Sequence, residues 1–379
     1  MKKRNNGVKT MENKEVNLYD YPMAMTQQFR HCGNPFRIDT YKGCDFGCQY
    51  CFANCRGGNF DTSFKVANME IINKNFVKAF EKDKETKNLT IELLRNRVPL
   101  HLGGLSDPFQ KRKFDYGCTY ELLKLTPKYN YPVLISTKTG NLPEKYFDVL
   151  DKDIHAFQIS LISLNNNYIR RFEKNTPSPQ ERISFIRKLK EKGFWVGIRI
   201  QPLIDVKEAY RLVENISGVV DYITVEHIKI GNDNSNKEFL FKSIDLNPED
   251  FVSVGREYEL KTEIKRKNIE LLKTISKCPI GCGDNDLHEL SDSNNCCGID
   301  TINDNFNGWI KYNSMYISKT KDNSQWFPKC NCSACFNSEC RKNGYSFKNY
   351  VDDYIENPTK VKKAKINTEE RQLTIFDFL

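Results

Sequence analysis

Residues 41–58 read "YKGCDFGCQYCFANCRGG" and place Cys44, Cys48, Cys51 and Cys55 within twelve positions. Thiols this close together indicate a metal centre, and their spacing is C-x3-C-x2-C-x3-C. The bacterial ferredoxin run that holds a cubane iron–sulfur cluster is C-x2-C-x2-C-x3-C-P, so the first spacing and the final proline both differ here. Zinc sites more often use two C-x2-C pairs separated by a longer loop. The stretch alone leaves open a closed site with four ligands and an open site with three.

The whole chain has 379 residues, of which 39% are hydrophobic and 28% are charged, and this composition is typical of a globular protein. The first twenty residues contain no apolar signal segment, and no apolar run approaches the roughly 18 residues of a membrane span. We therefore expect a cytoplasmic protein without a membrane partner. In that reducing compartment, fourteen cysteines predict metal ligation rather than disulfides. The net charge of +9 is a weak indication of a polyanionic partner, because Lys and Arg are spread along the chain.

Strand and helix patterns alternate between residues 35 and 230, which is typical of a parallel sheet built through crossover connections. One helix is clear: Ser178 and Glu181 form a capping box, and Gly193 ends the segment. Six such units predict an α/β protein with a partial (β/α)6 TIM-like barrel. Reactive residues of these barrels gather at the C-terminal ends of the strands, which is where the cysteine stretch falls. The expected strands are residues 36–42, 98–103, 131–138, 156–163, 195–204 and 221–228.

The periodicity fails after residue 230, and this sets the expected domain organisation. We expect an N-terminal extension over 1–34 and the partial barrel over 35–230. A polar, irregular segment, a connecting helix near 263–277 and a small Cys-rich C-terminal domain would occupy 231–350. A charged linker and an apolar terminal peptide would make up 351–379.

The C-x3-C-x2-C spacing, with Tyr50 directly before the third cysteine, resembles the cluster motif of the radical S-adenosylmethionine (SAM) superfamily. The resemblance implies that Cys44, Cys48 and Cys51 bind three irons of a 4Fe-4S cluster and that the fourth iron binds SAM. Reductive cleavage of SAM would give a 5′-deoxyadenosyl radical. Cys55 would lie outside the ligand set, and an electron donor such as flavodoxin or ferredoxin would reduce the cluster. A four-cysteine electron-transfer cluster and a zinc site are the alternatives.

Downstream motifs agree with this superfamily and narrow it to one group. In "HLGGLSDP", residues 101–108, Gly103 and Gly104 would let the backbone approach the amino group of SAM, because glycine has no Cβ. The resemblance to the spore photoproduct lyase group, whose relatives are often described as DNA repair photolyases, covers about residues 33–210. It rests on the stretches 103–110, 133–140 and 159–183.

In the spore photoproduct lyase group, a serine and an aspartate after the second strand, a lysine after the third and a serine on the fourth surround SAM. The matching residues are Ser106, Asp107, Lys138 and Ser160. That group also carries a cysteine just before the serine–aspartate pair, and this cysteine returns a hydrogen atom to the product radical. Because this chain has glycine there, Cys118 is the candidate hydrogen donor, with a small buried helix residue as the alternative.

Two further groups of cysteines follow the predicted barrel. Each group, or a site that draws on both, could hold an auxiliary iron–sulfur cluster, as many radical SAM enzymes do in a C-terminal domain. Structural zinc and unligated thiols are the alternatives. The residues concerned are Cys278, Cys282, Cys296, Cys297, Cys330, Cys332, Cys335 and Cys340, with His288 among them.

The last eight residues, "QLTIFDFL", follow the charged linker. Gln372, Leu373, Ile375 and Phe376 resemble the peptides with which DNA-processing proteins bind sliding clamps; a terminal turn that packs back on the protein is the alternative. The sequence therefore favours a radical SAM enzyme that abstracts hydrogen from DNA for repair or modification. The alternatives are a radical SAM enzyme that modifies a peptide or RNA, and a non-catalytic iron–sulfur protein that binds DNA.

Overall fold

The computed structural model describes the chain from residue 8 to residue 312, with short gaps. Nine residues with a predicted role lie outside the described residues: Cys55, Cys330, Cys332, Cys335, Cys340, Gln372, Leu373, Ile375 and Phe376. The described ranges are 8–11, 14–26, 32–54, 64–83, 88–111, 116–232, 234–243, 247–254 and 257–312.

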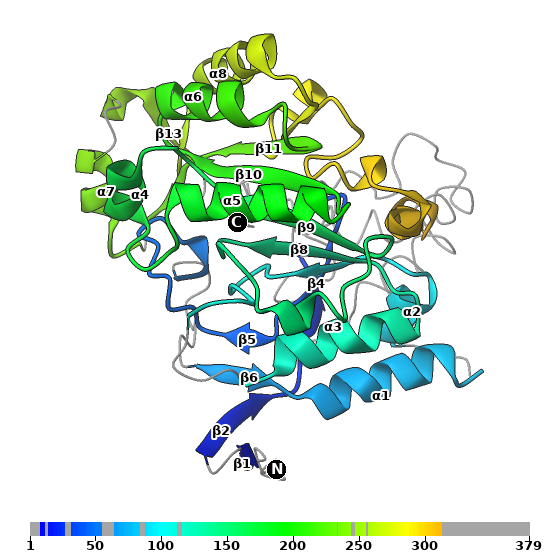
Figure 1. The fold of residues 1–379 in the computed structure, drawn as a ribbon. Coiled ribbons are helices and arrows are strands. Elements are labelled where there is room, and N and C mark those ends of the chain that lie inside the picture. The colour runs from blue at the N-terminus through cyan, green and yellow to red at the C-terminus, as the bar shows by residue number, and fades with distance from the viewer. Residues whose placement is uncertain are drawn as a thin grey trace, which may run out of the picture.

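A largely parallel sheet forms the centre of the molecule (Figure 1). Within the described residues it has eight strands in the order β15-β11-β10-β9-β8-β7-β4-β3. All neighbours are parallel except β3 and β4, so six predicted strands form one consecutive row, as an open partial barrel requires. The strands are β3 (Met23–Met25), β4 (Phe36–Ile38), β7 (Leu100–Leu102), β8 (Val133–Thr137), β9 (His155–Ser160), β10 (Val196–Leu203), β11 (Tyr222–His227) and β15 (Ile280–Cys282).

Helices cover the outer face of this sheet, and α5 crosses in front of β9 and β10 in Figure 1. The predicted capping box at the start of α5 is confirmed, since Ser178 Oγ accepts from the backbone of Glu181 and the Glu181 carboxylate accepts from the backbone of Ser178. No described helix is long and apolar enough to span a bilayer. The helices are α1 (Met69–Phe80), α2 (Leu89–Arg95), α3 (Cys118–Lys128), α4 (Asn166–Phe172), α5 (Pro179–Glu191), α6 (Val206–Ile216), α7 (Lys237–Ser243) and α8 (Thr262–Ile275).

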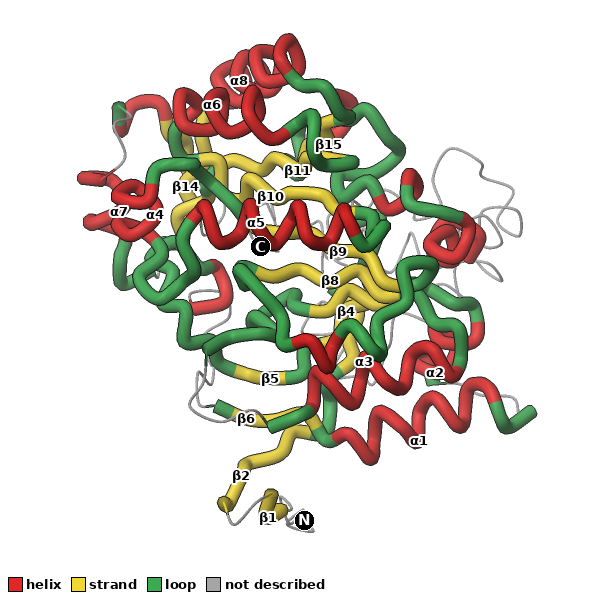
Figure 2. Tube along the Cα trace, in the orientation of Figure 1, coloured by secondary structure: helices red, strands yellow, loops and turns green. Residues whose placement is uncertain are grey.

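Two smaller sheets flank the central one. The first, with order β1-β2-β6-β5, lies below the barrel in Figure 2. The second is antiparallel, with order β12-β14-β13. Their strands are β1 (Val8–Met11), β2 (Lys14–Tyr19), β5 (Tyr41–Lys42), β6 (Lys65–Ala67), β12 (Lys229–Gly231), β13 (Phe251–Val254) and β14 (Glu257–Leu260).

These elements correct the sequence expectations in two places. The strand predicted over 36–42 is divided into β4 and β5, which belong to different sheets, and the segment predicted to be irregular contains β12 to β14. The central sheet also extends past the predicted boundaries at 35 and 230, through β3 and β15. Strands β12 to β14 have three or four residues and lie in a polar segment without an apolar run, so the sequence shows no strand pattern there.

The two faces of the central sheet differ in polarity. Phe157, Ile159 and Ile198 point to the helices and are fully buried. The residues between them point to the inner face, where Ser160 is the register partner of Arg199. The alternation of side chains along a strand therefore collects polar groups on the inner face.

The segment 293–307 covers part of the inner face. The Thr224 hydroxyl donates to the carbonyl of Cys296 (2.8 Å), and the Gln158 amide donates to the carbonyl of Cys297 (3.2 Å). Below these bonds, Cys297 packs in a small apolar cluster with Leu134, Ala156, Ile299 and Phe306. A segment from the predicted C-terminal region is therefore part of the barrel core.

Candidate active site

The predicted cluster ligands lie on one loop that follows β5. Cys44 is exposed, and Cys48 and Cys51 are half-buried. Partial desolvation by the surrounding protein raises the pKa of the Cys44 thiol to about 11, and the charges of Asp107 and Cys51 add to the increase. Burial likewise raises the pKa of Cys48, which also interacts electrostatically with both other thiols. The three thiols are thus near one another, and those of Cys44 and Cys48 are protonated at neutral pH.

This donor set fits an iron–sulfur cluster. Within the ranges given above, no group of three or more His, Cys, Asp or Glu side chains is arranged to hold one metal ion. A cubane cluster is held by cysteine thiolates, each bound to a different iron. Three soft thiols on one loop are donors of this kind.

The cluster loop, residues 44–51, is held by a segment that we call the brace, residues 172–176. Cys48 and Glu173 form an isolated antiparallel bridge between the loop and the brace. Three hydrogen bonds join the same segments, so the loop has a fixed backbone partner over most of its length. These bonds run from Gln49 N to Phe172 O (2.8 Å), from Asn175 N to Phe46 O (3.2 Å) and from Asn175 Nδ2 to Asp45 O (2.7 Å).

Beneath Cys48 the brace places a buried charge network. The carboxylate of Glu173 is fully buried, 2.5 Å from the guanidinium of Arg182 and 4.0 Å from Lys138 Nζ. Tyr50 donates its hydroxyl hydrogen to the same carboxylate. Burial would raise the pKa of Glu173, but the charges of Arg182 and Lys138 outweigh burial and lower it. Glu173 is therefore ionised, and its charge is balanced by two cations.

The sequence analysis missed Glu173 and Arg182 as parts of the site. Their spacing of nine residues spans the end of α4 and the start of α5, so no single helical or strand pattern pairs them. The available signal was weak: a charged side chain, Arg182, lies among the buried positions of a helix whose other buried residues are mostly apolar.

Asp107 organises the loop that follows β7. Its Oδ1 accepts from the Thr137 hydroxyl (2.8 Å) and from Phe109 N (2.9 Å). Its Oδ2 accepts from Lys138 N (2.6 Å), at the end of β8. The predicted SAM contacts Asp107 and Lys138 are therefore adjacent, but the aspartate is already engaged in holding the two strand ends together. Its contact with SAM stays a prediction.

Ser106 has a similar internal partner. Its hydroxyl donates to the carbonyl of Tyr41 (2.5 Å), so it ties the loop after β7 to β5. Asp39, at the end of β4, accepts from the backbone of Leu105 (2.7 Å) and of Ser106 (3.3 Å). These bonds fix the loop beside the cluster loop, and the contact of Ser106 with SAM also stays a prediction.

The predicted glycine pair lies at the start of the same loop. Gly103 has a φ of +93°, and a Cβ there would lie 2.3 Å from the carbonyl oxygen of Ser136. Gly104 has an ordinary φ, and a Cβ there would meet the side chain of Arg37 at 3.5 Å. The backbone thus requires glycine at position 103, whereas position 104 has room for a small side chain.

Ser160 and Lys138 lie at the C-terminal ends of neighbouring strands. On the inner face beside them, Arg199 donates to the hydroxyl of Ser136 (3.3 Å), and His101 Nε2 lies 2.8 Å from the same hydroxyl. Burial, with a smaller contribution from Arg199, lowers the pKa of His101 to about 3. The imidazole is therefore neutral, and the positive charge on this part of the inner face comes from Arg199.

Cys118 does not lie on the inner face. It is the first residue of α3, is 1% exposed, and packs with Tyr41 and Val66. Its Sγ lies 3.6 Å from the carbonyl of Ala67. This position is that of the alternative, a small buried helix residue, and the role as hydrogen donor stays a prediction.

The described C-terminal cysteines are divided between two environments. Cys282 is fully buried in the main core, and Cys278 is half-buried beside Ser276. Cys296 and Cys297 lie on the inner face, where Cys32 interacts with both of them electrostatically. Cys32 was not singled out in the sequence because it stands alone before the first barrel strand. The ligand role of these residues stays a prediction.

Comparisons with known proteins agree with this geometry. The profile of the radical SAM superfamily matches residues 38–213. An uncharacterized protein of Methanocaldococcus jannaschii is 23% identical over 251 residues, which cover 65% of this chain and 87% of that protein. An uncharacterized protein of Mycobacterium tuberculosis is 26% identical over 187 residues, which cover 45% of this chain and 50% of that protein.

Among solved structures, a similar fold occurs in a spore photoproduct lyase complexed with a dinucleoside spore photoproduct. The TM-score is 0.50 at 16% sequence identity, and the match covers 68% of this chain and 78% of that one. At this identity the likeness concerns the fold.

Proposed function

We propose, from the premise that residues 38–213 make this chain a member of the radical SAM superfamily, that it is a radical SAM enzyme acting on a nucleic acid. The cofactors of that superfamily are a 4Fe-4S cluster and SAM. When bound, they supply a 5′-deoxyadenosyl radical that removes a hydrogen atom from the substrate. The observation that carries the proposal is the loop of Cys44, Cys48 and Cys51 at the C-terminal end of the barrel strands.

Residues of this chain would hold and orient the cofactors. Cys44, Cys48 and Cys51 would be the cluster ligands, and the brace would keep their loop against the barrel. Lys138 is 15% exposed at the end of β8, where its ammonium group would suit the carboxylate of SAM. Ser160, half-exposed at the end of β9, would offer a hydroxyl on the same side.

DNA is the substrate that we favour, for repair or modification. Support comes from the lyase of similar fold that is complexed with a dinucleoside, and from the net charge of +9. The terminal residues 372–376 would bind a sliding clamp and so bring the enzyme to DNA. A target base would have to leave its stack at a cost of a few kcal/mol unless the DNA were single-stranded or damaged.

The test follows deuterium from substrate to cofactor product. Anaerobically reconstituted, reduced protein is incubated with SAM and deuterated DNA, and 5′-deoxyadenosine is analysed by mass spectrometry. We expect 5′-deoxyadenosine that carries deuterium. 5′-Deoxyadenosine without deuterium would contradict the DNA assignment and favour a peptide or RNA substrate. Parallel incubations with deuterated peptide or RNA would test these alternatives. No 5′-deoxyadenosine at all would favour a non-catalytic DNA-binding protein.

The sliding-clamp prediction has its own test. Full-length protein and a variant that ends at residue 371 are compared for binding to an immobilised clamp. We expect the full chain to bind and the shortened one to lose most of its affinity. Equal binding by both proteins would contradict the role of Gln372, Leu373, Ile375 and Phe376 and weaken the case for DNA. Flavodoxin and ferredoxin are the reductants that we propose for these reactions.

A further inference from the structure

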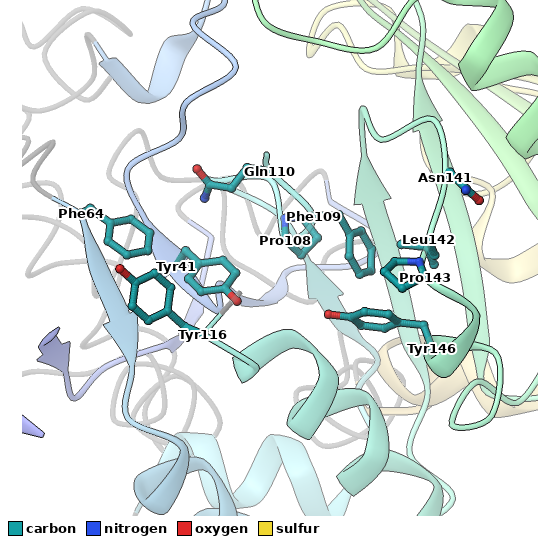
Figure 3. Close-up of a pocket in the computed structure, with 10 residues that line it drawn as sticks. All are labelled: Tyr41, Phe64, Pro108, Phe109, Gln110, Tyr116, Asn141, Leu142, Pro143 and Tyr146. Atoms are coloured by element: carbon teal, nitrogen blue, oxygen red, sulfur yellow. The ribbon is translucent and has the colours of Figure 1, made fainter. Parts of the chain in front are cut away.

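A cavity of about 180 Å³ lies beside the cluster loop (Figure 3). Half of its lining residues are aromatic and come from separate segments, and the close-up shows two of them, Tyr41 and Tyr146, on opposite sides of the space. Ligands of drug size fill about 300–1,000 Å³, so this cavity has room for one small planar ring system. The lining residues are Tyr41, Phe64, Pro108, Phe109, Gln110, Tyr116, Asn141, Leu142, Pro143 and Tyr146.

The aromatic wall is arranged in two groups. Phe64 stacks on Tyr41 with ring centroids 5.7 Å apart, and Tyr116 tilts against Phe64 at 5.2 Å. On the other side, Phe109 meets the edge of Tyr146 at 5.4 Å. A flat ligand between the two groups would contact ring faces or edges on both sides, which is how aromatic platforms bind unpaired bases.

Positive charge accompanies the aromatic residues along the chain. Lys42 follows Tyr41, Lys65 follows Phe64, Lys111 follows Gln110, and Lys145 precedes Tyr146. Lys42, Lys111 and Lys145 are exposed, and none of the ten lining residues is acidic. Glu144, the acidic neighbour of Lys145, is paired with Lys188. In space, Lys145 makes the rim of the cavity basic, since its Nζ lies 5.8 Å from the centroid of the Tyr146 ring, and this charge suits an anionic ligand.

The cavity is also tied to the cluster loop. Gln110, one of its lining residues, donates from Nε2 to the carbonyl of Gly43 (3.0 Å). Its Oε1 accepts from Asp45 N (3.0 Å), so one side chain bonds both sides of Cys44. A ligand in this cavity would therefore lie next to the loop that we assign to the iron–sulfur cluster.

We infer that this cavity binds one unpaired base of a single-stranded nucleic acid, whose phosphates lie on the flanking lysines. SAM fits the site less well, because its sulfonium and ammonium groups give it a net positive charge among lysines. A neutral aromatic metabolite would not need the basic rim. The inference rests on the proposed function for the class of substrate, and it adds a second contact site outside the barrel interior.

The test uses equilibrium binding, so it does not require SAM cleavage. Reconstituted full-length protein is titrated against fluorescent single strands of about ten thymidines or uridines, a length within the range of one binding module. We expect Tyr116→Leu to weaken binding about tenfold, the size of one lost base stack. The double variant Lys111→Gln/Lys145→Gln should weaken binding. It should also make the slope of the logarithm of the binding constant against the logarithm of the salt concentration shallower by about 0.7 for each lysine removed.

Two lysines far from the cavity give a matched control. Lys207 on α6 and Lys267 on α8 are exposed, and Lys207→Gln/Lys267→Gln should bind like the wild type. Because all four lysines replaced in these two variants are exposed, both should fold even if Tyr116→Leu does not. Preference for thymidine or uridine strands would identify the nucleic acid.

Three results would overturn the inference: wild-type protein that binds neither strand, cavity variants that bind like the wild type, and SAM that competes with the strand for the site. Each is distinguishable from failure of the proposed function. A protein that makes no 5′-deoxyadenosine can still bind single strands through this cavity, and a protein that cleaves SAM can still lack the cavity site.

Discussion

Gly103 and Gly104 are neighbours with different backbone conformations, and they provide a matched test at the level of single residues. A Cβ at Gly103, where φ is +93°, would lie 2.3 Å from the carbonyl oxygen of Ser136; at Gly104 it would meet Arg37 at 3.5 Å. We expect Gly103→Ala to lower the free energy of unfolding by about 1–3 kcal/mol, and Gly104→Ala by less than about 1 kcal/mol. Urea unfolding measures both, and equal effects would contradict this view of the loop.

Glu173→Gln tests the buried charge network. The substitution leaves Arg182 buried without its carboxylate partner, which costs about 3–5 kcal/mol of unfolding free energy in comparable pairs. Because the Glu173 carboxylate also accepts from the hydroxyl of Tyr50, which lies on the cluster loop, we expect the variant to retain less iron after reconstitution. Thermal unfolding and iron analysis provide the two measurements.

The buried pair of Lys265 and Glu259 gives the control, since its two side chains are 3% and 13% exposed and lie 3.2 Å apart. Glu259→Gln should destabilise the protein but leave the iron content per folded chain unchanged. If both variants lost iron to the same extent, the effect would follow from stability alone and the role of Glu173 at the cluster loop would be wrong.

The network also predicts a pH dependence. The pKa of Glu173 is lowered from its ordinary 4.5, so its ionised form stabilises the fold above that pH. The contribution declines as pH falls below 4.5 toward the lowered pKa, because the carboxylate then takes up a proton more readily in the unfolded chain. We expect the difference in unfolding free energy between wild type and Glu173→Gln to be constant near neutral pH and to narrow in acid. A constant difference down to pH 3 would contradict an ionised Glu173.

The sequence singled out residues that stand in local motifs. Cys44, Cys48 and Cys51 share one motif, and Ser106, Asp107, Lys138 and Ser160 match motifs at the ends of predicted strands; the cofactor roles of all seven stay predictions. Glu173 and Arg182 were not predictable in the same way, because only the turn between α4 and α5 brings them together. Two residues that are close in space, but whose separation in the sequence fits neither a helical nor a strand period, leave no periodic signal.

At the level of elements, the brace is the feature that fixes the cluster loop. Asn175→Ala removes the bond from Asn175 Nδ2 to Asp45 O (2.7 Å) and should cost about 0.5–1.5 kcal/mol. We expect faster hydrogen exchange of the amides in residues 44–51, measured by mass spectrometry. Asn305→Ala is the control, because it removes a bond of the same kind, to Asp153 O, far from the loop. Equal exchange at 44–51 in both variants would contradict the brace.

Elements were predictable where the surrounding sequence carries a repeating pattern or an apolar run. The capping box of α5 and the strand pattern around β10 are visible because thirteen and eight residues repeat a period. β5 has two residues and β15 has three, so neither can show one. Their sheet membership comes from tertiary pairing, as when Cys282 of β15 pairs with Val225 of β11.

For the whole molecule, the sheet joins segments that the sequence separated. Met23–Met25, before the predicted barrel, and Ile280–Cys282, after it, are strands of the same sheet. Gly33 and Asn295 are so close that a Cβ on the glycine would lie 2.3 Å from the asparagine side chain. The domain boundaries at residues 35 and 230 were predicted from changes in polarity along the chain. Long-range packing, however, decides which segments share a core.

The central claim is that three cysteines hold a 4Fe-4S cluster, and iron and sulfide analysis after anaerobic reconstitution tests it most directly. The wild type is compared with a Cys44→Ala/Cys48→Ala/Cys51→Ala variant and with Cys118→Ala, in which the removed thiol is buried outside the cluster loop. We expect the triple variant to lose about four irons and four sulfides per chain, and Cys118→Ala to lose none. A triple variant that kept all of its iron would contradict the account.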